Sequence, residues 1–72
     1  KFQYFSPLHS ILVAPAAVYQ GEGAEYPLVF DKPLPAGSEV GVIEASENGE
    51  WLKIQTVDGT IGFIPAKVIR II

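Results

Sequence analysis

A chain of 72 residues has room for one small domain, and its core must form without disulfides because the sequence contains no cysteine. With a single histidine and no thiolate ligand, a zinc site is improbable. The net charge is −3, and the five basic residues are scattered among eight acidic ones, which argues against a nucleic-acid partner. Hydrophobic residues make up 49% of the chain, enough for a packed core with apolar surface left for a neighbouring domain or a second copy.

Membrane insertion by this segment is not expected. The longest apolar run, residues 11–18, is too short to span a bilayer and contains Pro15. Because the chain also contains no methionine, we expect it to be a processed or excised piece of a longer protein, with any targeting segment outside it.

The first ten residues show no regular hydrophobic period. We interpret residues 1–10 as a linker whose Phe2, Tyr4 and Phe5 dock on the folded domain. That domain is expected to cover residues 11–72.

The remainder of the first half gives weak strand signals. Residues 12–20 are expected to form a strand interrupted at Pro15, and residues 28–32 a second, short strand. Between them, the glycine-containing segment 21–27 is typical of a loop. Residues 33–38 form a turn that leads into the second half.

Residues 39–46 begin the clearer half of the sequence and predict a strand. Val40 and Val42 fall on one face, as expected of a half-buried strand. Ile43 breaks the alternation, which indicates a β-bulge or a strand covered on both sides.

Three further strands follow, at residues 50–57, 60–65 and 68–72. In the first of these, Leu52 and Ile54 share one face, whereas Trp51 points to the other. We expect the core to contain Leu52, Ile54, Ile64 and Ile69.

Two turns connect these strands into an antiparallel meander. Residues 47–49, Glu-Asn-Gly, suit a short hairpin link, and the Asp-Gly pair at 58–59 is the stronger hairpin signal. Pro65 ends the third strand of the meander because it has no N–H for the ladder. Ala66 and Lys67 are expected to make one 3-10 turn before the last strand.

Together these elements predict an all-β fold. We expect a small, five- to six-stranded, partly open barrel with a long early loop. Closure of a barrel limits exposed strand edges, which matters for a chain this apolar.

The second half also resembles the bacterial Src-homology-3-like (SH3b) domain. That family has a Gly-x-x-Val strand start, a turn, a Trp, a Lys-Ile pair, an Asp-Gly turn and a Gly-aromatic-Ile motif. This sequence has the same order in Gly37 and Val40, residues 47–49, Trp51, Lys53 and Ile54, Asp58 and Gly59, and Gly62, Phe63 and Ile64. Residues 18–30 are similar to the family's opening strand, irregular loop and second strand, so the resemblance covers about residues 11–72.

The resemblance implies an SH3-like barrel that acts as a non-catalytic binding module for a peptide, a peptidoglycan-type ligand or a protein partner. The residue order is also similar to the domain that closes many Bacteroides-type envelope proteins, which implies a location in the periplasm or at the surface of a bacterium. The motif "GFIPAKVI" further resembles the eukaryotic branch. However, Val68 stands where that branch has the tyrosine of its groove for proline-rich peptides.

Catalysis is not expected. His9 is the only imidazole, and it lies in the irregular leader, where a solvent-exposed or docking histidine is the simpler interpretation. The glutamates at 44, 47 and 50 flank one hairpin, where carboxylates are usually solvated, and a barrel this small offers no deep substrate cleft. No metal or cofactor is expected.

Trp51 is the strongest candidate for contact with a ligand. An aromatic plate flanked by tyrosine and proline binds extended peptides or sugars with a large contact area at low entropic cost. The candidate groove consists of Tyr19, Tyr26, Trp51, Phe63 and Pro65. The alternative is that Trp51 only covers the edge of the core.

Two classes of function therefore stay open. One is a binding module at the cell envelope; the other is a structural or assembly domain that packs against its own chain, a partner or a second copy. In the second case the apolar excess of residues 1–5 and 68–72 would form the contact surface.

Overall fold

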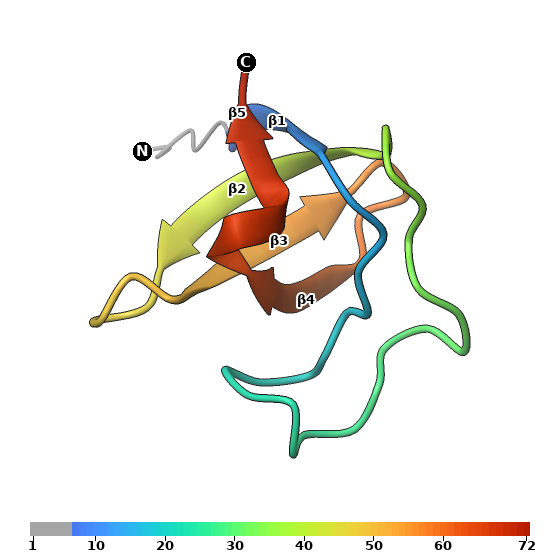
Figure 1. Cartoon of the computed structure of the whole chain (residues 1–72), viewed down its shortest axis with the longest axis vertical. Coiled ribbons are helices and arrows are strands. Elements are labelled where there is room, and N and C mark those ends of the chain that lie inside the picture. Colours follow the sequence, from blue (N-terminus) through green and yellow to red (C-terminus); the bar gives the residue numbers. More distant parts are fainter. Residues whose placement is uncertain (1–6) are drawn as a thin grey trace, which may run out of the picture.

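A computed structural model describes residues 7–72, so the expected docking of Phe2, Tyr4 and Phe5 lies outside the described residues. Within this range the chain forms an all-β fold of five antiparallel strands in one open sheet (Figure 1). The described elements, in chain order, are β1 (Leu8–Leu12), β2 (Glu39–Ala45), β3 (Trp51–Thr56), β4 (Ile61–Pro65), the 3-10 helix η1 (Ala66–Val68) and β5 (Ile69–Ile71). The predicted small, barrel-like all-β fold and its 3-10 turn before the last strand are confirmed.

The meander of β2, β3 and β4 forms as predicted, and β1 and β5 extend the sheet to the order β4-β3-β2-β1-β5. The register between β2 and β3 shifts between Val42 and Glu44, which places the predicted bulge at Ile43. Gly49 (φ 76°) and Gly59 (φ 90°) occupy the left-handed region at the two hairpin turns, where glycine adopts this conformation without steric cost.

The start of the sheet differs from the prediction. β1 begins at Leu8, inside the segment expected to be a linker (residues 1–10), and no continuous strand spans residues 12–20. The reason is Ser10, which faces the interior although it is polar and is completely buried. Its hydroxyl donates to the carbonyl oxygen of Leu8 at 3.0 Å, so the buried polar group has a hydrogen-bond partner. Because a serine occupies this inward position, the sequence does not show the hydrophobic alternation that would have predicted the strand.

The expected strand at residues 28–32 is also wrong. The long early loop, which runs from β1 to β2 (Figure 1), forms isolated bridges in place of a strand: Ala16 with Leu34, Tyr19 with Leu28, and Tyr19 with Phe63 of β4. Pro27 and Pro33 flank the expected strand and have no N–H to donate, so the ladder cannot extend.

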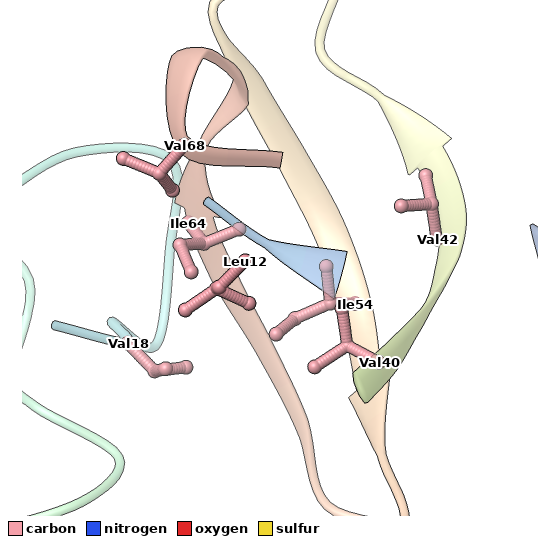
Figure 2. Packing of buried hydrophobic residues seen from close by; sticks show 7 residues of the cluster. All are labelled: Leu12, Val18, Val40, Val42, Ile54, Ile64 and Val68. Atoms are coloured by element: carbon pink, nitrogen blue, oxygen red, sulfur yellow. The ribbon is translucent and has the colours of Figure 1, made fainter. Parts of the chain in front are cut away.

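The core is formed by seven buried side chains from all parts of the described chain (Figure 2). Ile54 and Ile64 are fully buried; Ile54 lies on β3, the central strand of the meander, and Ile64 on its neighbour β4. The complete set is Leu12, Val18, Val40, Val42, Ile54, Ile64 and Val68. Of the core residues predicted, Leu52 and Ile69 are only partly buried and pack against this cluster.

The early loop lies directly on β4. Tyr19 and Phe63 exchange two backbone hydrogen bonds, of 2.9 Å and 2.8 Å, which add one bridge to the free edge of the strand. Next to this bridge, a Cβ at Gly62 would lie 2.3 Å from Cγ1 of Val18. The absence of a side chain at Gly62 therefore allows the loop to approach the sheet this closely.

Candidate functional site

Trp51 and Tyr19 form an edge-to-face aromatic pair on the outer surface of the sheet. Their ring centroids are 5.9 Å apart and the ring planes are inclined by 78°. This geometry directs the positive edge of one ring at the negative face of the other, which favours the contact beyond simple burial. Both side chains are partly buried, so each also presents surface to solvent.

Strand pairing explains how residues so far apart in sequence meet. Trp51 begins β3 and is paired with Pro65 at the end of β4, whereas Tyr19 is paired with Phe63. Phe63 in turn is the β4 partner of Lys53. Residues that are directly paired on neighbouring strands point to the same face of a sheet, and along one strand every second side chain points to that face. The side chains of these five residues therefore all lie on the outer face.

A hollow opens beside Trp51 and has a volume of about 520 Å³. It is lined by Gly49, Glu50, Trp51, Pro65, Ala66 and Lys67. The backbone N–H of Ala66 donates to the carbonyl oxygen of Glu50 at 2.9 Å, which ties the two sides of the hollow together beyond the ends of β3 and β4. The hollow thus combines an indole ring and a proline ring with an exposed carboxylate and an exposed ammonium group.

Four of the five candidate groove residues belong to this surface, but in different ways. Trp51 and Pro65 line the hollow itself, Tyr19 contacts the indole ring, and Phe63 positions Tyr19 through its backbone. Tyr26 lies apart in the early loop, where its ring covers Gly21, and 46% of the residue is exposed. The lining of the hollow, as described for residues 7–72, does not include Tyr26.

Sequence reasoning missed two charged residues that line the hollow, Glu50 and Lys67. The signal was present in the pairing of Trp51 with Pro65, because one further step along each strand brings Glu50 opposite Ala66. Lys67 is the next residue, in η1, and this turn places it at the edge of the hollow.

A second, smaller hollow of about 260 Å³ lies over Gly41, at the other end of β3. Pro7 lies above Gly41, where a Cβ would be only 2.4 Å from the proline ring. At its border Nε2 of His9 lies 3.2 Å from Oε1 of Glu39, and both side chains are largely exposed. His9 therefore joins β1 to β2 at the surface.

The turn that follows β3 contains Asp58, whose carboxylate accepts several hydrogen bonds. The hydroxyl of Thr56 donates to the Asp58 carboxylate, and the backbone N–H of Thr60 donates to it at 3.1 Å. These hydrogen bonds favour the ionised form and lower the pKa of Asp58 below its ordinary value. The effect stabilises a hairpin turn at a distance from the Trp51 hollow along β3.

Within residues 7–72, no three side chains of the metal-binding types gather closely enough to hold an ion. The same part of the chain has no helix with the length and apolar character needed to cross a membrane. Comparisons with models of protein families and with curated proteins gave no match. The geometry of the hollow is therefore the main basis for assigning a role to the chain.

Proposed function

We propose that this domain is a non-catalytic binding module, and that its Trp51 hollow receives an extended peptide or cell-wall peptide. The single observation that carries the proposal is the edge-to-face pair of Trp51 and Tyr19 at the border of a hollow whose floor includes Pro65. Rigid aromatic and proline rings offer a large contact area and lose little side-chain entropy when a ligand binds.

The two charged residues of the hollow, Glu50 and Lys67, indicate which charges the proposed ligand carries. Glu50 and Lys67 are both exposed and line the same hollow, so they can pair with a basic and an acidic group of a peptide. A zwitterionic or mixed-charge peptide with an apolar centre fits this arrangement better than a uniformly charged polymer. The resemblance of the sequence to bacterial SH3-like domains supports the same class of ligand and a place in the cell envelope as part of a longer protein.

The experiment is a titration of the domain with muropeptides and with proline-rich peptides, followed by the fluorescence of Trp51, the only tryptophan. We expect a saturable change in emission with one of these ligands. Calorimetry then compares Trp51→Ala, which should abolish binding, with Val57→Ala, which removes an 89% exposed apolar side chain outside the hollow and should leave affinity unchanged.

Far-ultraviolet circular dichroism must show that Trp51→Ala keeps the β fold. If it unfolds, Lys67→Ala and Glu50→Ala provide the same test without removing a partly buried ring, since both side chains are exposed. Unchanged binding in both of these variants, or no response of the native domain to either ligand class at millimolar concentration, would refute the proposal.

A second candidate function, self-assembly, is favoured by a different observation. Leu8, Ile71 and Ile72 lie where β1 begins and β5 ends, and they are 54%, 54% and 71% exposed. Analytical ultracentrifugation over a range of concentrations separates the two functions. Association that is lost in Ile72→Lys, without any response to peptide, would assign the chain to the assembly class.

A further inference from the structure

We propose that the turn between β2 and β3 contains a site of spontaneous covalent modification: the side chain of Asn48 deamidates through attack by the backbone nitrogen of Gly49. Asn48 is the only asparagine in the chain, and it directly precedes a glycine. Both residues are exposed. Apart from the two chain neighbours, no described residue lies within 4 Å of the position that a Cβ would occupy at Gly49, so this side of the turn is open.

Hydrogen bonds hold the electrophile in a single arrangement. Oδ1 of Asn48 accepts from the hydroxyl of Ser46 at 2.7 Å and from the backbone N–H of Glu50 at 3.0 Å. Two donors on the same carbonyl oxygen withdraw electron density from Cγ and stabilise the negative charge that develops on Oδ1 during attack. The two hydrogen bonds therefore polarise the amide group for attack.

The reaction balances without any other reactant than water. The deprotonated Gly49 nitrogen forms a bond to Cγ of Asn48, and the bond from Cγ to the side-chain nitrogen breaks, releasing ammonia. The product is a five-membered succinimide ring. Water then opens the ring at either carbonyl, which gives aspartate or isoaspartate at position 48.

One hydrogen bond opposes the reaction. The N–H of Gly49 donates to the carbonyl oxygen of Ser46 at 2.9 Å, and this bond must break before the nitrogen can lose its proton and attack. We therefore expect deamidation in the native domain to be slower than in the unfolded chain, and to rise with pH as more of the amide is deprotonated.

The chain contains its own comparison at the other hairpin turn. Asp58 and Gly59 have the same sequence pattern and Gly59 also has positive φ with no atom near a Cβ, among the residues described. There the electrophile is a carboxylate that Thr56 and Thr60 keep ionised, and an ionised carboxylate resists attack because no good leaving group is present. The same reaction should thus be far slower at Asp58 than at Asn48.

Position 48 is connected by hydrogen bonds to Trp51 of the candidate site. The Ser46 hydroxyl that donates to Asn48 also accepts the backbone N–H of Trp51 at 3.1 Å, so the turn and the indole-bearing residue share one hydrogen-bond network. Deamidation places a new carboxylate beside Glu47 and Glu50, and isoaspartate adds a methylene to the backbone of the turn. The effect on ligand binding rests on the function proposed above; the modification itself does not.

The test is incubation of the folded domain at neutral and mildly alkaline pH, followed by peptide mapping with mass spectrometry and enzymatic methylation of isoaspartate. We expect first-order conversion of Asn48, with a shift to a more acidic species, faster at the higher pH, and far less isoaspartate at Asp58. Asn48→Gln is the matched control, because its longer side chain keeps the amide but cannot close a five-membered ring, and its conversion should be lost.

The same incubation in denaturant should accelerate conversion at Asn48. An unmodified Asn48 after long incubation at the alkaline pH, or isoaspartate at Asp58 to an equal extent, would overturn the proposal. Peptide titration of Asn48→Asp measures the consequence separately: unchanged affinity there counts against the link to the hollow but not against the modification.

Discussion

Asp58 shows how one exposed carboxylate can make stability depend on pH. Its pKa is lowered in the folded chain chiefly by the Thr56 hydroxyl, and next by the Thr60 N–H. A group with a lowered folded pKa contributes its stabilisation above its unfolded pKa and loses it as the pH falls through the folded pKa. We therefore expect the native domain to lose stability progressively once the pH drops below the ordinary range of an aspartate.

Asp58→Asn isolates this effect because the amide oxygen can still accept from Thr56 and Thr60 but does not titrate; the variant is measured freshly prepared, before the Asn-Gly pair that it creates can deamidate. The free energy of unfolding, measured in urea at a series of acidic pH values, should fall less steeply in Asp58→Asn than in the native domain. If the free energy of unfolding had the same pH dependence in both proteins, the hydrogen bonds from Thr56 and Thr60 would not affect the protonation of Asp58.

At the scale of elements, the close contact of the early loop with β4 requires a glycine at position 62. Gly62→Ala pushes a methyl group against Val18, which is stiff and buried, so we expect a loss of about 1–3 kcal/mol, the usual cost of overpacking. In the background of Val18→Ala, the same substitution should cost less, because the space is then empty.

Chemical denaturation of the single and double variants measures this coupling. Gly59→Ala serves as the control: its cost comes from positive φ with no atom in contact, among the described residues, so it should be the same with and without Val18→Ala. Equal cost of Gly62→Ala in both backgrounds would mean that the loop can shift away from the sheet freely.

The sequence predicts those elements whose signals are local, and fails where they are not. Pro65 ends β4 and Ile43 forms the bulge because each acts through its own backbone or side chain. β1 was missed because Ser10 is buried, which only its hydrogen bond to Leu8 makes tolerable. In the candidate site, strand parity correctly directs Trp51 outward, but its contact with Tyr19 depends on the path of a loop between β1 and β2 that has almost no regular pairing.

For the whole molecule, stability rests on a small core without cross-links. A 72-residue domain is expected to have about 4–11 kcal/mol of stability. Ile54 is completely buried at the centre of the core, so Ile54→Ala should cost about 2–5 kcal/mol and leave much of the protein unfolded at 37 °C, whereas Ile54→Val should cost only about 0.5–1.5 kcal/mol.

Urea unfolding followed by circular dichroism tests this ranking. Ile61→Ala, on the exposed outer face of β4, is the control and should change stability by no more than about 0.5 kcal/mol. A small effect of Ile54→Ala would indicate that the core can collapse around the missing atoms.

The antiparallel pairing of β1 with β5 also has a mechanical consequence. The backbone N–H of Ile72 donates to the carbonyl oxygen of His9, so the two ends of the described chain leave the sheet at the same place (Figure 1). Tension applied between Leu8 and Ile72 would load the rungs of this ladder one after another, like a zipper, rather than all at once. If this domain is embedded in a longer protein under strain, we expect the ladder between its first and last strands to separate before the ladders of the meander.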